Sequence, residues 1–296
     1  MKYSIGDRTY KHDSSWGKLP AGYEFTQVAG VAVDGKDNVY VFNRSQHQLM
    51  VFSREGELVK IWERPFSQPH GAHVDKNGNV YLVDRDTHVV EIFNPNEELL
   101  LTLGNKGIPS DTGKISETMP VEKAAGPNNM PTGVTTSENG DIFVSDGYGN
   151  CRVHKYDSQG TLLNSWGIPG TEKPGEYNLP HGIGVDNLGR VLVCDRENHR
   201  IQVISQDGKQ ITIWTGFKQP TSVAFDSEGK IYVPELQARL SVIDEEGSVL
   251  ARWGGEESDV PGEFKAPHCA AVDSHGDIYV GEVLEGMRLQ KFVRES

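Results

Sequence analysis

Short runs in which apolar and polar residues alternate recur along the whole chain. Examples are VAVD from Val31, IGVD from Ile183 and AAVD from Ala270, each followed by a turn rich in Asp, Asn and Gly. A second run then follows, such as NVYVF from Asn38 or NVYLV from Asn79. Period-two alternation of β-branched and aromatic residues between turn residues predicts short antiparallel β-strands.

This pattern repeats six times. The copies begin at Gly30, Gly71, Gly133, Gly182, Ser222 and Cys269, at intervals between 40 and 62 residues. The sixth copy contains one further apolar run and the other five contain two, the last of which in most copies follows a glycine turn such as Glu55-Gly56. Six repeats of four strands, at about this spacing, predict an all-β, six-bladed β-propeller.

The two ends of the chain complement each other. The last copy stops after its third predicted strand, whereas residues 1–16 precede the first copy and end in Trp16, which resembles Trp166 and Trp253 after two fourth strands. We therefore expect residues 1–16 to supply the missing outer strand of the last blade, which protects a sheet edge. The prediction is a single domain over residues 1–296, with an insert at 105–130 that is either a lid or a surface loop without a role.

Composition narrows the function. Lys and Arg number 29 against 42 Asp and Glu, a net charge of −13, so nucleic acid is not an expected partner. No apolar run approaches the roughly 20 residues of a membrane span, so no membrane partner is expected. Three cysteines, Cys151, Cys194 and Cys269, show no Cys-x-x-Cys spacing, which argues against disulfides and a thiolate zinc site. With no secretion signal visible, we expect a cytoplasmic protein.

Histidine occupies one equivalent position in alternate repeats. The residue just before the first strand, here called the strand-start residue, is His70, His181 and His268 in the second, fourth and sixth repeats. A proline precedes each of them and stiffens the backbone there. Alternate sectors of a six-fold ring are about 120° apart, so these imidazoles are expected to converge. Three histidines leave a fourth position open, which is typical of catalytic zinc, although another divalent metal is compatible.

Charged residues are expected at the same end of the propeller. Because the first two strands of a blade are antiparallel, the end of the second strand lies beside the start of the first. Residues that leave a second strand in this way include Arg44, Arg85, Tyr148 and Arg196. Guanidinium groups bind carboxylates with two parallel hydrogen bonds, so a small anionic substrate or a peptide C-terminus is the expected partner. The alternative is that the arginines pair with acids such as Asp84 and Asp195.

These motifs carry a family resemblance over nearly the whole chain. The repeats resemble NHL repeats, and their ordered set resembles the peptidyl-α-hydroxyglycine α-amidating lyase, the second catalytic unit of peptide amidation. The most specific segments are VSDGYGNCR from Val144, CDRENHRIQ from Cys194 and the three Pro-His pairs.

The resemblance implies a zinc ion held by His70, His181 and His268, and catalytic roles for Arg44, Tyr148 and Arg196. The implied reaction splits an α-hydroxyglycine-type (hemiaminal) amide into an amide and glyoxylate. Zinc would polarise the α-hydroxyl, an arginine would hold the carboxylate, and Tyr148 would take the hydroxyl proton. Arg44, Arg85 and Arg196 are the expected substrate-binding residues.

The sequence also departs from that family. The family has an aspartate directly after the third histidine that helps to bind a structural calcium, whereas Cys269 stands there, which argues against calcium. The paired cysteines of the family are not reproduced. Two other functions remain open: a metal-dependent hydrolase of an ester, lactone or amide on the same histidines, and a non-catalytic NHL propeller that binds a partner.

Overall fold

The computed structural model describes residues 2–114 and 119–295, and residues 115–118 of the expected insert lie outside the described residues. It confirms the all-β, six-bladed β-propeller: apart from a 3₁₀ helix at Arg196–Asn198, the described elements are β-strands. Within the described ranges, no helix has the length and apolar character needed to cross a bilayer. The chain divides into two compact units, and a single domain over residues 1–296 stays a prediction.

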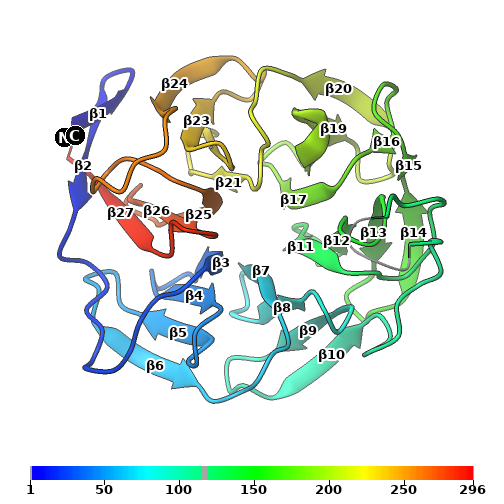
Figure 1. Cartoon of the computed structure of the whole chain (residues 1–296), viewed down its shortest axis with the longest axis horizontal. Coiled ribbons are helices and arrows are strands. Elements are labelled where there is room, and N and C mark those ends of the chain that lie inside the picture. Colours follow the sequence, from blue (N-terminus) through cyan, green and yellow to red (C-terminus); the bar gives the residue numbers. More distant parts are fainter. Residues whose placement is uncertain (1, 115–118, 296) are drawn as a thin grey trace. The chain divides into compact units, whose positions relative to one another are not determined.

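The unit Ser67–Pro220 holds the second, third and fourth blades, each an antiparallel sheet whose strands follow one another in chain order (Figure 1). Their strands are β7 (Pro69–Val74), β8 (Val80–Asp84), β9 (Val89–Phe93) and β10 (Leu99–Leu103); β11 (Pro131–Thr136), β12 (Ile142–Asp146), β13 (Arg152–Tyr156) and β14 (Leu162–Trp166); and β17 (Pro180–Val185), β18 (Val191–Asp195), β19 (Arg200–Ile204) and β20 (Gln210–Trp214). A short parallel pair, β15 (Ile168–Pro169) and β16 (Glu176–Tyr177), lies between the third and fourth blades in sequence.

The unit Met1–Phe66 with Thr221–Ser296 holds the first, fifth and sixth blades. Their strands are β3 (Val28–Val33), β4 (Val39–Asn43), β5 (Leu49–Phe52) and β6 (Leu58–Trp62); β21 (Ala224–Phe225), β22 (Ile231–Glu235), β23 (Arg239–Ile243) and β24 (Val249–Gly254); and β25 (Pro267–Val272), β26 (Ile278–Glu282) and β27 (Leu289–Arg294).

The N-terminal segment closes the sixth blade as expected, with one addition. Strand β2 (Arg8–Asp13) pairs with β27 and is the fourth strand of the blade, while β1 (Lys2–Ile5) pairs with β2 and adds a fifth. The turn between β1 and β2 contains Gly6 at φ +61°, a backbone conformation that glycine adopts without strain. The N-terminal segment therefore contributes two strands to the sixth blade, whereas the sequence predicted one.

Apolar alternation places the core between neighbouring blades of a unit. In the unit Ser67–Pro220, Tyr81 and Val83 of β8 pack in one buried cluster with Val134 of β11 and Val144 of β12. Every residue of β8 is buried, whereas most of the outer strand β10 is exposed. Burial of a Val-sized side chain contributes roughly 1.5–3 kcal/mol, so the inner strands carry most of the stability.

A β-bulge marks the strand-start residue. The pairing of the first strand with the second shifts register at this position in five blades, between Val28 and Gly30, Pro69 and Ala72, Pro131 and Gly133, Pro180 and Ile183, and Pro267 and Cys269. A bulge leaves a residue out of the ladder and re-aims its side chain. The strand-start side chains therefore need not follow the alternation of side chains between the two faces of the sheet.

In two blades, the aspartate that ends the second strand accepts hydrogen bonds from the segment just before the bulge. The Asp84 carboxylate accepts the backbone N–H groups of Ser67 and Gln68, both at 2.9 Å. Asp195 accepts that of Asn178 at 2.8 Å in the same way. These buried carboxylates fix the backbone just before the two histidine bulges of this unit, because charge-assisted hydrogen bonds to N–H groups are short and strong.

Candidate metal centre and anion site

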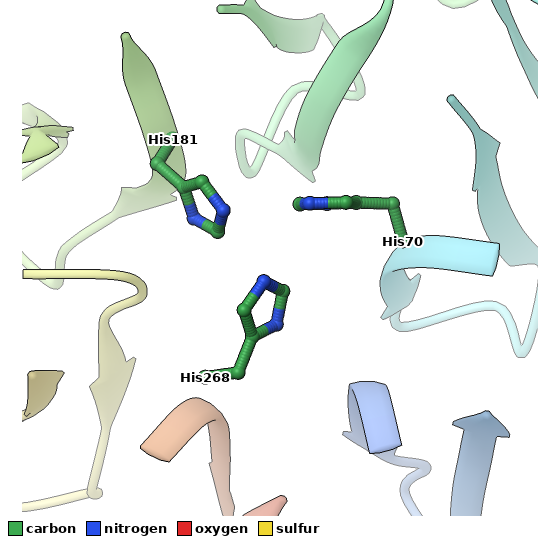
Figure 2. Close-up of side chains that lie close together, drawn as sticks. All are labelled: His70, His181 and His268. Carbon is green, nitrogen blue, oxygen red and sulfur yellow. The ribbon is translucent and has the colours of Figure 1, made fainter. Parts of the chain in front are cut away.

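The three histidines come together. His70, His181 and His268 are buried, and each offers one ligand atom, with these atoms all within 4.8 Å of one another. Figure 2 shows the three imidazoles pointing toward one another. In the unit Ser67–Pro220, the ring centroids of His70 and His181 are 4.8 Å apart.

Hydrogen bonds orient two of these imidazoles. His70 Nδ1 lies 2.6 Å from the carbonyl oxygen of Thr132, and His268 Nδ1 lies 2.8 Å from that of Ala29. A carbonyl oxygen only accepts, so Nδ1 carries the proton and Nε2 keeps its lone pair. This arrangement is the one found for metal-binding histidines. The residues therefore fit a divalent metal.

Tyr148 lies beside the histidines in the unit Ser67–Pro220. Its hydroxyl oxygen is 3.5 Å from His70 Nε2, and its ring centroid is 5.9 Å from that of His181. Arg196 Nη1 donates a hydrogen bond to the same oxygen at 3.2 Å. The structure thus brings together four residues that sequence analysis selected, namely His70, His181, Tyr148 and Arg196.

Two guanidinium groups face the Tyr148 ring. Arg85 Cζ is 4.9 Å and Arg196 Cζ 5.5 Å from the ring centroid, distances typical of cation–π contacts. Their side chains are only 15 % and 12 % exposed. Each guanidinium donates through Nε to the next residue, Asp86 at 2.7 Å and Glu197 at 2.9 Å.

The acids considered as alternative partners for these arginines are engaged elsewhere. Asp84 accepts the backbone bonds described above, and Asp195 pairs with Arg200 Nε at 2.7 Å. Burial raises the pKa of Asp195, and its hydrogen bonds, including that from Arg200, oppose the rise. Arg85 and Arg196 form ion pairs with Asp86 and Glu197 instead, so the alternative of acidic partners holds for their Nε groups, with different acids from those named in the sequence analysis.

A close backbone approach explains the glycine before Tyr148. A Cβ atom on Gly147 would lie 2.1 Å from the carbonyl oxygen of Pro180, so a larger residue requires the backbone to move. The Tyr148 N–H then donates to the Met130 carbonyl at 3.3 Å. Gly147 thus lets this loop approach the residue that precedes His181, which sets the position of the tyrosine.

Arg44 belongs to the other unit, and its expected role stays a prediction. Arg44 Nη1 donates to Gln27 Oε1 at 2.6 Å. Burial raises the pKa of the Cys269 thiol next to His268, and the charge of Arg44 partly opposes that rise. The Cys269 thiol donates to the Val28 carbonyl at 3.5 Å. A neutral, buried thiol is not a ligand that calcium prefers, and the expectation of no calcium stays a prediction.

Sequence reasoning missed the groups that support the site. The Thr132 and Ala29 carbonyls orient imidazoles, and backbone carbonyls leave no signal in a sequence. The recurring acid at the end of the second strand (Asp84, Asp146, Asp195, Glu235 and Glu282) was visible but was considered only as a partner for the arginines. His73, three residues after His70, lies 2.9 Å from Thr136 Oγ1, and burial lowers its pKa to about 4.

Comparison with known proteins identifies the family. The NHL repeat matches residues 128–156 and 177–204. Human NHL repeat-containing protein 3 is 30 % identical over 249 residues, which is 79 % of this chain and 69 % of the human protein. The chain belongs to the NHL repeat-containing protein family. The expected resemblance to NHL proteins is thereby confirmed.

Amidating enzymes are also among the relatives of this NHL protein. A probable peptidyl-alpha-hydroxyglycine alpha-amidating lyase of Caenorhabditis elegans is 40 % identical over 77 residues, 25 % of this chain and 22 % of that protein. Mouse peptidyl-glycine alpha-amidating monooxygenase is 37 % identical over 86 residues, 27 % of this chain and 9 % of the mouse protein. The matched segments thus span less than a quarter of either enzyme.

Solved structures support the fold. A streptogramin B lyase structure has a TM-score of 0.68 at 12 % identity and covers 99 % of this chain and 100 % of its own. A gluconolactonase from Xanthomonas campestris has a TM-score of 0.65 at 12 % identity, covering 98 % and 91 %. At this identity the two structures support the propeller fold of this NHL protein.

Proposed function

We propose that this NHL protein is a zinc-dependent lyase that splits an α-hydroxyglycine-type amide into an amide and glyoxylate. The observation that carries the proposal is the set of three buried histidines, with Tyr148 beside two of them and Arg196 bonded to Tyr148. The similarity to amidating enzymes in both sequence and motif supports the same reaction class.

Zinc is the proposed metal because the ligands are neutral imidazoles, with no thiolate or carboxylate among the three. Three protein ligands leave a coordination position for substrate. A bound zinc ion would act as a Lewis acid on the α-hydroxyl oxygen of the substrate. His70 and His268 would hold it through Nε2, since their Nδ1 protons are donated to backbone carbonyls.

The arginines would bind the carboxylate of the substrate. Arg196 and Arg85 flank Tyr148, and Arg44 is proposed as a third contact. Because the chain carries a net charge of −13, these little-exposed guanidiniums provide a local attraction for an anion that the protein as a whole lacks. The planar guanidinium suits a carboxylate through two parallel hydrogen bonds.

Tyr148 is the proposed proton carrier. Arg196 donates to its oxygen, so the hydroxyl is oriented by that bond and lies next to His70 Nε2. The tyrosine oxygen would take the proton of the substrate hydroxyl as the Tyr148 O–H gives its own proton to the amide nitrogen, which leaves the tyrosine neutral. The electron pair of the substrate O–H bond would form the C=O bond of glyoxylate, and the electron pair of the broken C–N bond would go to the nitrogen that is protonated.

The decisive experiment measures metal content and products together. Freshly purified chain is analysed for zinc and then incubated with N-benzoyl-α-hydroxyglycine. A lyase releases benzamide and glyoxylate in equal amounts, and a chelator such as 1,10-phenanthroline abolishes the reaction. The expected zinc content is about one ion per chain, as for a single three-histidine site.

The amide product separates the competing functions. A hydrolase would release benzoate, because water attacks the acyl carbon, while glyoxylate can still appear when free α-hydroxyglycine decomposes. Benzoate without benzamide would therefore favour the hydrolase. Absence of stoichiometric zinc together with no product of either kind would favour a non-catalytic binding propeller.

A further inference from the structure

We infer that a pocket beside Tyr148 receives an apolar acyl group on the amide side of the substrate, an inference that rests on the proposed lyase function. The pocket has a volume of about 440 Å³ and lies within the unit Ser67–Pro220. This volume is within the range of sites that hold small organic molecules.

The pocket and the histidine site share one side chain, that of Tyr148. Tyr148 lines the pocket, while its hydroxyl oxygen lies 3.5 Å from His70 Nε2. Leu179, two residues before His181, also lines it, and its carbonyl accepts the Arg196 N–H at 3.2 Å. A substrate whose carboxylate is held by Arg196 would therefore extend its other end past the tyrosine ring into this space.

The described part of the insert, residues 105–114 and 119–130, contributes one wall and is tied to the loop that carries Tyr148. Thr112 Oγ1 donates to the Gly149 carbonyl at 2.7 Å, and Asn150 Nδ2 donates to the Ala125 carbonyl at 2.6 Å. Val121 packs against the buried cluster of the third and fourth blades. The described part of the insert is therefore an anchored wall of this pocket.

The lining is mostly apolar. Met119, Pro120 and Val121 come from the insert, and Pro169 and Leu179 from the segment before β17. Burial raises the pKa of the Cys151 thiol to about 12, so this lining residue is neutral as well. An aliphatic or aromatic acyl group matches this chemistry.

Lys114 is the cation among the described lining residues. A lysine can lay its methylene stem on an apolar wall and keep its ammonium group in water. It also raises a competing possibility, an acyl group that ends in a second carboxylate. The ligand series below includes that case.

Binding of N-acylglycines, which lack the hydroxyl and cannot be split, tests the pocket separately from catalysis. Affinities of the full-length protein for acetylglycine, hexanoylglycine and adipoylglycine are measured by isothermal titration calorimetry. Each buried methylene strengthens binding about fourfold, so hexanoylglycine should bind at least about tenfold more tightly than acetylglycine even when burial is partial.

Two variants and one control place that preference in the pocket. Thr171→Trp fills the space from an exposed lining position, and Met119→Ser removes apolar wall; both should reduce the hexanoyl-to-acetyl ratio to below about threefold. Thr102→Trp, on the exposed face of β10 and away from the pocket, should keep the wild-type ratio. Circular dichroism melts confirm that each variant is folded.

Several results would overturn the inference. They are equal binding of the acetyl and hexanoyl ligands, no binding of either, an unchanged ratio in Thr171→Trp, and tighter binding of adipoylglycine than of hexanoylglycine. The last result would assign the pocket to a second carboxylate. Benzamide release by the wild-type protein is measured in parallel, so failure of the pocket and failure of the lyase function are distinguished.

Discussion

The strand-start residues of neighbouring blades lie at equivalent bulges but have different roles. In the second, fourth and sixth blades this residue is a histidine whose nitrogen joins the cluster. In the first and third blades it is Ala29 and Thr132, whose carbonyls accept the Nδ1 protons of His268 and His70. One set thus supplies ligand atoms, and the other set orients them.

The threonines add a second form of support. Thr132 Oγ1 donates to the Pro180 carbonyl at 2.8 Å, and Thr221 Oγ1 donates to the Pro267 carbonyl at 3.2 Å. Each hydroxyl therefore holds the proline that precedes a histidine, His181 and His268 respectively. Equivalent positions of the repeat thus hold either a metal-binding histidine or a residue that orients one. Mutations can test these two roles separately.

Loss of a ligand should have the largest effect. We expect His181→Ala to lower kcat/KM for N-benzoyl-α-hydroxyglycine by more than about 10³-fold and to remove zinc, because two imidazoles hold the ion poorly. Benzamide release and elemental analysis measure both effects. The matched control is His275→Ala at an exposed position, which should retain zinc and activity. A zinc-loaded, fully active His181→Ala would rule out this histidine as a ligand.

Loss of the proposed proton carrier should come next. Tyr148→Phe removes the hydroxyl beside His70 and keeps the ring under Arg85 and Arg196, so kcat should fall about 10²–10⁴-fold with zinc content unchanged. Steady-state kinetics and metal analysis provide the measurements. If kcat instead stays within a factor of two, another group carries the proton.

The arginines should show a smaller, binding-related effect. Arg196→Lys keeps the positive charge but loses planar, bidentate geometry and the bond to Tyr148, so KM should rise about tenfold, equivalent to about 1.4 kcal/mol. Arg64→Lys serves as a control, because Arg64 follows the outer strand β6 and has no part in the site contacts described above. An unchanged KM in Arg196→Lys would move the carboxylate site elsewhere.

A support residue should have the smallest effect. Thr132→Val removes the buried hydroxyl that holds Pro180 but keeps the carbonyl that accepts from His70. We expect the free energy of unfolding to fall by about 1 kcal/mol while zinc remains bound and kcat/KM changes less than about threefold. Urea denaturation and metal analysis test this expectation. Loss of zinc in this variant would show that the hydroxyl, and not only the carbonyl, supports the site.

Much of the fold could be predicted because its causes are local. Alternation such as NVYLV before Asp84 predicts a β-strand from neighbouring residues alone. Six repeats of such strands bury the apolar faces of their sheets against one another most readily in a propeller. The alternate histidines could also be selected, since His70, His181 and His268 occupy one position of the repeat. The bulge at that position could not be read from the pattern, because it depends on how each first strand pairs with its neighbour.

The sequence by itself determined the number of blades, the residues that begin each first strand and the residue types available for metal and carboxylate binding. Only the tertiary structure decided that Thr132 and Ala29 orient imidazoles, that Asp195 pairs with Arg200 while Arg196 turns to Tyr148, and that the insert lines a pocket. The reason is physical: strand periodicity is set by neighbouring residues, whereas a hydrogen bond to a distant carbonyl exists only after the blades have packed.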